Sequence, residues 1–246
     1  MESLDLSGRS ILVTGSANGI GRALVLALAE NDGDVAVHYR TSENAARETT
    51  AAARKRGSGS VTTVSGDVTA EEEVHRLFDA VEDELGPVDV LINNVGAFAP
   101  VHWESLDLST WNRVLQTNLT ATFLCTKRAL PAMREGGFGR VVNVGYASSE
   151  RGLVNPTNFP FFAAKAGVLL FTRMVAADTQ EDGITANAVS PYVVENSETF
   201  PDELPRGRPA QFEDIVHAVR FFLDGRSDYV SGANLEVDGG WLPESV

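Results

Sequence analysis

A glycine-rich segment near the amino terminus has the residue types and spacing to hold a phosphate group. It reads Thr14-Gly15-Ser16-Ala17-Asn18-Gly19-Ile20-Gly21 and follows a strand-like run, Ser10 to Thr14. Glycines at a strand-to-helix turn let a pyrophosphate approach the free amides at the start of the helix. The segment indicates a dinucleotide site, although a purely structural glycine turn is the alternative. Its candidate ligands are Gly15, Ser16, Asn18, Gly19, Ile20 and Gly21.

The end of the next strand bears on the choice of nucleotide. Sites that prefer NAD carry an acidic residue there for the ribose hydroxyls. Here the sequence is His38-Tyr39-Arg40-Thr41-Ser42, without a carboxylate. Arg40 and Ser42 could instead hold the 2′-phosphate of NADP through charge-assisted hydrogen bonds. The segment predicts NADP(H) as the cofactor; the alternative is that Arg40 is only a solvated surface cation.

The elements that must position these residues alternate along nearly the whole chain. Apolar strand-like runs followed by helical patterns are typical of a parallel sheet covered on both faces. We therefore predict an α/β fold: a single Rossmann domain over residues 1–246 with a doubly wound, mostly parallel seven-stranded sheet and helices on both faces. Strands are predicted at 10–14, 34–39, 61–65, 88–93, 140–144, 184–189 and 234–237.

Two long helices and one irregular segment complete this prediction. The helices are expected over 109–133 and 162–180. Residues 192–208 are rich in proline and are expected to form a flexible flap over a small-molecule substrate. Within the flap, Asn196, Ser197 and Arg206 are candidate substrate contacts.

Composition excludes several classes of function. The formal net charge of −14 argues against binding to nucleic acid or to an anionic membrane surface. One cysteine and four scattered histidines argue against a metal site. The first five residues lack the features of a signal peptide, which predicts a cytoplasmic protein. The apolar run from Phe159 to Ala177 contains Lys165 and Arg173 and therefore predicts a core helix rather than a membrane span.

The balance of charged residues suggests an acidic surface of the kind suited to a high-salt cytoplasm. The chain has 34 acidic residues, and only three of its 20 basic residues are lysines. An ordinary acidic surface is the alternative, because surface charge reports on solubility rather than on fold.

Further motifs follow the glycine segment at regular places. They are Asp67-Val68, Asn93-Asn94-Val95-Gly96, Asn118, Lys165, Ser190-Pro191 and Val237-Asp238-Gly239-Gly240. Together they resemble the short-chain dehydrogenase/reductase family over essentially the whole chain, and most closely the branch of 3-oxoacyl carrier-protein reductases and pteridine reductases.

This resemblance implies roles for individual residues. Asp67 and Val68 would contact the adenine, Lys165 would bond the nicotinamide ribose, and Asn118 would serve a water-mediated proton relay. Further cofactor-binding positions implied by the resemblance are Asn93, Asn94, Gly96, Pro191 and Val194. The alternatives are structural: a strand cap for Asp67, a turn former for Asn93, a helix-kink residue for Asn118 and a solvated cation for Lys165. The family's assembly surfaces also imply a homotetramer.

One departure from the family pattern bears on catalysis. The family carries a tyrosine four residues before the lysine, and here Phe161 stands at that position. Phenylalanine has no hydroxyl and cannot protonate a carbonyl oxygen during hydride transfer. Tyr146 occupies the place of the family's serine, with Ser148 and Ser149 just beyond. One hypothesis is that Tyr146 supplies a phenol whose pKa is lowered by Lys165 and the nicotinamide ribose; the alternative is that Tyr146 only packs beside Phe161 and Phe162.

Two functional hypotheses follow. The first is an NADPH-dependent oxidoreductase that reduces a carbonyl or a pteridine-like substrate by hydride transfer. The second is a catalytically impaired NADP-binding pseudoenzyme with a regulatory or structural role, which the missing hydroxyl at Phe161 favours. Dehydration or dehalogenation on the same fold ranks last. Tyr192, where the family carries glycine, is expected to narrow the nicotinamide end of the cleft.

Overall fold

The computed structural model describes residues 4–151 and 155–241 of the 246-residue chain. The described residues form one seven-stranded sheet in the order β3-β2-β1-β4-β5-β6-β7, in which every neighbouring pair is parallel. The strands are β1 (Ser10–Val13), β2 (Asp34–Tyr39), β3 (Val61–Ser65), β4 (Val90–Asn93), β5 (Gly139–Val144), β6 (Ile184–Pro191) and β7 (Asn234–Val237).

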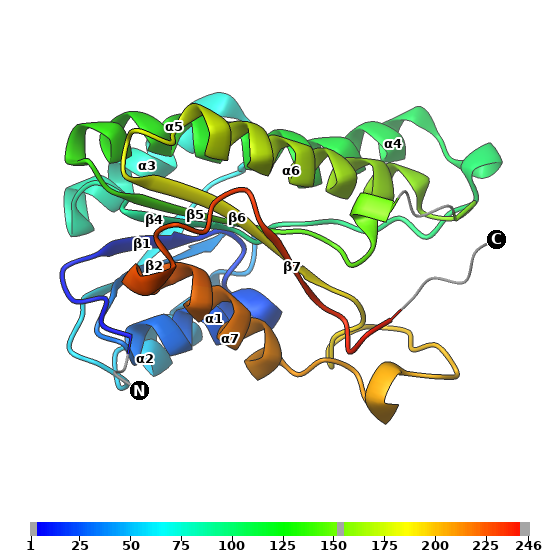
Figure 1. Cartoon of the computed structure of the whole chain (residues 1–246), viewed down its shortest axis with the longest axis horizontal. Coiled ribbons are helices and arrows are strands. Elements are labelled where there is room, and N and C mark those ends of the chain that lie inside the picture. Colours follow the sequence, from blue (N-terminus) through cyan, green and yellow to red (C-terminus); the bar gives the residue numbers. More distant parts are fainter. Residues whose placement is uncertain (1–3, 152–154, 242–246) are drawn as a thin grey trace.

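Helices cover both faces of this sheet. They are α1 (Gly19–Ala29), α2 (Glu43–Ala53), α3 (Glu71–Leu85), α4 (Leu108–Leu115), α5 (Ala121–Gly136), α6 (Phe159–Asp178) and α7 (Phe212–Leu223). Helices α1, α2 and α7 lie on one face, and α3, α4, α5 and α6 lie on the other (Figure 1). Shorter turns are η1 (Trp103–Ser105), the π-helical η2 (Gln116–Thr120), η3 (Ser149–Arg151), η4 (Pro205–Gly207) and η5 (Gly225–Ser227).

Burial on both faces explains why the central strands read as continuous apolar runs. Every residue of β5 and of β6 is buried. A strand with one solvent-exposed face would alternate between apolar and polar residues instead. Two apolar clusters result, one between the sheet and α1 and α7, and one between the sheet and α3 and α5.

Helix α3 shows how local sequence determines an element. Its buried residues, Val74, Leu77, Phe78 and Val81, recur at helical spacing and face the sheet. Three glutamates, at positions 71–73, occupy the first turn, where a negative charge is favoured by the helix dipole. Full burial of a side chain such as Phe78 contributes about 1.5–3 kcal/mol.

The strand order places a crevice at one end of the sheet. Strands β2 and β3 lie on one side of β1, and β4 to β7 lie on the other. Ligands bind outside the carboxyl ends of the strands at such a switch point. The segments that follow β1, β4, β5 and β6 therefore meet where the sequence placed its candidate residues.

The predicted fold is confirmed, with local differences. The sheet is entirely parallel in the described part of the chain rather than mostly parallel. The helix predicted over 109–133 consists of α4, the π-helical turn η2 and α5. The helix predicted to begin at residue 162 begins at Phe159, because Pro160 is compatible with a first helical turn. Residues 192–208 are irregular apart from η4, and their flexibility stays a prediction.

Helix α6 is the one described helix with the length and hydropathy of a membrane span, and half of its most apolar window is buried inside the protein. Lys165 lies buried within this helix. These observations agree with the predicted core helix.

Candidate active site

The glycine loop after β1 is held in place by a buried histidine. The Gly15 amide donates to Nδ1 of His38 at 2.8 Å, and the His38 amide donates to the Ser16 hydroxyl at 2.9 Å. Nε2 of His38 contacts the Gly66 carbonyl at 3.0 Å. Burial lowers the pKa of His38, against the opposing effects of the Gly66 carbonyl and of Asp67. The imidazole is therefore neutral, accepting at Nδ1 and donating at Nε2.

The start of α1 fits a pyrophosphate. A Cβ added to Gly21 would lie 2.5 Å from the Gly15 carbonyl oxygen and 2.7 Å from Cα of Ser16, so only glycine allows the loop to fold this closely. Asn18 precedes the helix and makes no side-chain cap. The first amides of α1 consequently keep their donor capacity for a ligand.

Two asparagines lie at the carboxyl end of β4, and one of them holds the glycine loop. The Asn94 amide group donates to the carbonyls of Thr14 and Gly15 at 3.0 and 3.1 Å. The Asn93 amide group donates to the hydroxyl of Thr126 and to the side chain of Asn143, inside the protein. Asn94, a candidate nucleotide ligand, thus fixes the loop through its side chain, and Asn93 supports the strand ends.

The predicted phosphate-binding cation lies at the carboxyl end of β2. Arg40 is largely exposed, and its guanidinium lies 3.2 Å from a carboxylate oxygen of Asp67. The other carboxylate oxygen of Asp67 accepts from the amide and hydroxyl of Thr69. Ser42 is exposed at the start of α2 and makes no capping bond, while Val68 is buried nearby in sequence. The structure therefore brings Arg40 and Asp67 together, although the sequence assigned them to different parts of the nucleotide.

Lys165 is a buried cation, so the alternative interpretation of it as a solvated surface lysine is wrong. Its ammonium group donates to the Val144 carbonyl at 2.6 Å. Only 4% of the residue is exposed, and burial lowers the pKa of Lys165 to about 8. A cation held in this environment is costly unless a polar ligand completes its hydrogen bonds.

Asn118 faces the same position as Lys165. A Cβ added to Gly96 would lie 2.9 Å from Oδ1 of Asn118 and 3.6 Å from Nζ of Lys165. The Asn118 amide group donates to the carbonyls of Ala97 and Val114, both at 2.9 Å. Its Oδ1 is buried and has no partner among the described residues. The unbonded Oδ1 of Asn118 and the remaining N–H groups of the Lys165 ammonium converge here. An acceptor and a donor in this arrangement fit a ribose hydroxyl or an ordered water.

The π-helical turn explains how Asn118 reaches this point. The turn η2 places one extra residue between α4 and α5, and such bulges often accompany functional sites. Asn118 is fully buried within it. The prediction of a long helix missed this break because its residues fit an ordinary helical pattern.

Phe161 lies in the first turn of α6, and Tyr146 follows β5; the two rings are neighbours. Their ring centroids lie 5.4 Å apart with an angle of 78° between planes. Phe161 is 3% exposed, and Nζ of Lys165 lies 5.7 Å from its ring centroid. The Tyr146 hydroxyl makes no hydrogen bond to another residue within the described chain. That phenol is therefore a donor available to a ligand.

Lys165 by itself does not lower the pKa of Tyr146 in this structure, and the combined effect of Lys165 and the nicotinamide ribose stays a prediction. Burial, reinforced by the neighbouring Tyr192, raises the pKa of Tyr146 above its usual value. The Lys165 ammonium instead bonds to the Val144 carbonyl. Tyr146 is consequently protonated throughout the physiological range.

Ser148 and Ser149 follow Tyr146 but do not replace it. Both are buried, and the described residues supply no hydrogen-bond partner for either hydroxyl. Ser148 adopts a left-handed backbone conformation with φ 62°, and its amide donates to Glu236 at 2.7 Å. This contact directs the segment toward β7.

The segment after β6 reaches back to the glycine loop. Pro191 ends β6, where its carbonyl accepts from the Ala147 amide at 3.0 Å. Val194 is buried. Nδ2 of Asn196 lies 2.9 Å from the position that a Cβ on Gly19 would take. Asn196, considered from sequence only as a substrate contact, therefore lies against the nucleotide loop.

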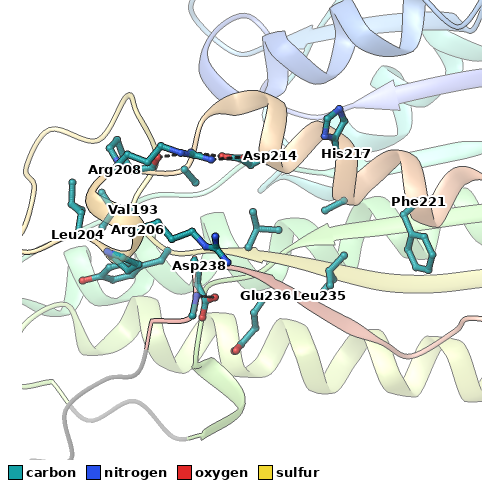
Figure 2. A pocket seen from close by; sticks show the side chains of 18 residues that line it. Val193, Leu204, Arg206, Arg208, Asp214, His217, Phe221, Leu235, Glu236 and Asp238 are labelled. Atoms are coloured by element: carbon teal, nitrogen blue, oxygen red, sulfur yellow. Dashed lines mark hydrogen bonds and ion pairs between the residues drawn. The ribbon is translucent and has the colours of Figure 1, made fainter.

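A pocket of about 670 Å³ lies beside this site, between the flap, α7 and β7 (Figure 2). Arg208 pairs with Asp214 at 2.6 Å on one wall, and Arg206 and Asp238 are further lining residues. Tyr192 also lines the pocket, and it contacts Tyr146 with ring centroids 6.2 Å apart. The predicted catalytic residues lie outside this pocket, so we place the candidate active site at Tyr146 and Lys165.

Two further expectations concern metals and thiols. In the ranges 4–151 and 155–241, no group of three or more histidine, cysteine or acidic residues could hold a metal ion. Cys125 is buried, and burial raises the pKa of its thiol to about 12. A thiol with this pKa is inert as a nucleophile at neutral pH.

Comparison with known proteins identifies the family of the chain. The family described as enoyl-(acyl carrier protein) reductase matches residues 15–242. A 3-oxoacyl-[acyl-carrier-protein] reductase from Synechocystis is 34% identical over 96% of this chain and 98% of its own length. An acetoacetyl-CoA reductase from Allochromatium vinosum is 31% identical over 94% and 98% of the two chains. The structure of a gluconate 5-dehydrogenase from Burkholderia cenocepacia, in complex with NADP and tartrate, superposes with a TM-score of 0.88 at 29% identity, covering 96% of each chain.

The fold and the site define a nucleotide-dependent α/β enzyme. The chain belongs to the short-chain dehydrogenase/reductase family and is an NAD(P)-dependent oxidoreductase of that family.

Proposed function

We propose that the protein is an NADPH-dependent reductase of carbonyl compounds, with Tyr146 as the proton donor in place of the hydroxyl that Phe161 lacks. The observation that carries this proposal is the position of Tyr146, whose ring lies 5.4 Å from Phe161 and whose hydroxyl is unbonded within the described residues.

The residues of the nucleotide side fit NADPH. The amides at the start of α1 would hold its pyrophosphate, Arg40 its 2′-phosphate, and Lys165 with Asn118 its nicotinamide ribose. NADPH supplies a hydride, which carries two electrons, when it is bound. Arg40 supports NADPH over NADH, because the described end of β2 presents this exposed guanidinium and no carboxylate.

The proton comes from the protein. Reduction of a carbonyl forms one C–H bond with the hydride and one O–H bond with a proton. The Tyr146 phenol donates that proton to the oxygen and is reprotonated from water. Its raised pKa keeps the donor form present across the neutral and mildly alkaline range. A phenol of raised pKa is a weaker acid than one beside a lysine, so we expect slow turnover.

The test compares NADPH oxidation by the natural chain and by Tyr146→Phe across a panel of uncharged ketones, quinones and oxidised pterins. We expect kcat to fall by about 10² to 10⁴-fold, because that is the typical contribution of a general acid. The Kd for NADPH should be unchanged. Tyr229→Phe is the matched control, since Tyr229 is fully exposed on the surface.

Other outcomes would overturn the proposal. Undiminished turnover in Tyr146→Phe would mean that another group donates the proton. Turnover by Phe161→Tyr alone, with NADPH binding intact in the natural chain, would show that the chain binds its nucleotide but has lost its acid.

The assembly that we propose is a homotetramer formed through α5 and α6. Large apolar side chains lie exposed on these helices: Phe123 is 42%, Leu170 68% and Met174 51% exposed. Exposed apolar groups gathered on adjacent helices are typical of an interface between subunits. A monomeric mass in light scattering would contradict this assembly.

A further inference from the structure

Six aromatic rings meet on the substrate side of the candidate site. Tyr146 lies at their centre and contacts rings from the segments after β4, β6 and β7 and from α6. The centroid of Tyr146 lies 6.4 Å from Phe98, 5.4 Å from Phe161, 5.6 Å from Phe162, 6.2 Å from Tyr192 and 6.5 Å from Trp241. We call these six residues the ring cluster.

Four members of the ring cluster are stacked in two pairs. Phe98 lies on Phe161 with centroids 4.0 Å apart and 25° between planes. Tyr192 lies on Trp241 at 3.8 Å and 9°. Stacked pairs present flat faces, and a further planar ring can add to them with a gain of about 0.5–1.5 kcal/mol beyond its buried area.

Phe98 is the member most open to a ligand. It is 58% exposed, yet hydrogen bonds hold its two neighbours in the chain. The Ala97 carbonyl accepts from Asn118 at 2.9 Å, and the Ala99 amide donates to the Asn158 side chain at 3.0 Å. Phe98 stacks on Phe161 and is still 58% exposed, so a ligand ring can stack on it as well.

The charges near the ring cluster argue for an uncharged ligand. Arg151, the cation closest to Tyr146 in the sequence, pairs with Glu236 at 3.0 Å. Lys165 is buried and bonded to the Val144 carbonyl. The formal net charge of −14 adds long-range repulsion of anions. Arg206 lines the neighbouring pocket together with Tyr192, so the preference for an uncharged ligand is inferred for the Phe98 face of the ring cluster.

We infer that the ring cluster selects an uncharged, planar, ring-conjugated ketone as the substrate, and that Phe98 determines this specificity. The inference deepens the proposed reduction and rests on it. The substrate ring stacks on the exposed face of Phe98 and brings its carbonyl oxygen toward the Tyr146 hydroxyl. A flexible aliphatic ketone lacks the flat face and gains only apolar contact.

The test uses two ketones of the same carbon skeleton, 1-tetralone and 1-decalone, of which only the first has an aromatic ring. Their kcat/KM values are measured for the natural chain, for Phe98→Leu and for Phe98→Trp. Leucine keeps the apolar volume but removes the ring, and tryptophan keeps a ring. We expect Phe98→Leu to lower the ratio of kcat/KM for tetralone over decalone by about 2- to 10-fold, chiefly through KM, and Phe98→Trp to preserve it.

The control is Tyr229→Leu, which removes a fully exposed ring outside the ring cluster. This variant should leave the ratio unchanged. An equal fall in kcat/KM for both ketones in Phe98→Leu would show that Phe98 contributes only apolar contact. That result would overturn the inference. A natural chain that reduces both ketones without preference would overturn it too, while leaving the proposed reduction standing.

Failure of the proposed reduction is distinguishable from failure of this inference. If neither ketone is reduced, the two ketones are titrated against the protein with NADP⁺ present, with tryptophan fluorescence as the signal. Trp241 belongs to the ring cluster and reports on its occupancy. Tighter binding of tetralone that Phe98→Leu abolishes would support the inference, and equal binding of the two ketones would overturn it.

Discussion

The nucleotide side and the substrate side of this site are built on opposite principles. The nucleotide side is a network of short polar contacts, in which Gly15, Ser16 and His38 hold one another within 3.0 Å. The substrate side is a set of aromatic rings around the Tyr146 phenol. The polar network leaves little freedom to its residues, whereas the rings tolerate changes in shape.

The largest expected effect comes from disturbing the nucleotide side. Gly21→Ala places a Cβ 2.5 Å from the Gly15 carbonyl oxygen and 2.7 Å from Nδ2 of Asn94. The backbone must move to accommodate this Cβ, and overpacking of this kind costs about 1–3 kcal/mol of free energy. We expect the Kd for NADPH, measured by calorimetry, to rise on the order of 100-fold.

Gly136→Ala is the matched control, because a Cβ there meets nothing within 4 Å. It should leave the Kd for NADPH unchanged. Unchanged affinity in Gly21→Ala would show that the loop adapts, and would remove the contrast with the ring cluster.

The same contrast explains what the sequence could predict. The glycine loop, Asn118 and Lys165 form recognisable motifs because each depends on a short segment with one conformation. The parallel sheet follows from runs of buried residues such as those of β5. The parallel sheet and the helices on both faces were predicted correctly, while the roles assigned to the glycine loop, Asn118 and Lys165 stay predictions.

The ring cluster could not be predicted in this way. Phe98, Tyr146, Tyr192 and Trp241 lie on separate segments, and only the fold brings them together. The role of His38 was also missed, because a single histidine near the end of a strand carries no sequence signal for a contact with the glycine loop. The effect of burial on Tyr146 was missed as well: without a nucleotide, burial raises the pKa of its phenol, and the Lys165 ammonium bonds to the Val144 carbonyl instead.

An intermediate effect is expected at the 2′-phosphate position. Arg40→Ala removes an exposed guanidinium, and a charge-assisted bond of that kind is worth about 1.5–3 kcal/mol before solvent screening. We expect the ratio of Kd values for NADH over NADPH to fall about 10-fold. Arg76→Ala, which changes an exposed arginine of α3, should leave the ratio as it is. Equal affinity of the natural chain for both nucleotides would contradict the preference for NADPH.

The smallest effect concerns the pH dependence of the histidine that holds the loop. Burial lowers the pKa of His38, although Gly66 and Asp67 oppose the change. Between this lowered pKa and the unfolded value of about 6.5, the unfolded chain binds a proton that the folded chain does not. The free energy of unfolding should therefore fall as the pH drops below about 6.5, by at most about 1.4 kcal/mol per pH unit from this residue.

His38→Gln isolates this contribution, because glutamine does not titrate. Denaturant unfolding between pH 5 and 7 should show a shallower loss of stability in His38→Gln than in the natural chain, and His75→Gln, at an exposed position on α3, should keep the natural slope. Protonated His38 also cannot accept from the Gly15 amide, so the Kd for NADPH should rise more steeply at low pH in the natural chain than in His38→Gln. The affinity of the ring cluster for an uncharged ketone should not follow this change, since its phenol stays protonated. A parallel loss of both affinities would mean that the two sides of the site respond as one unit.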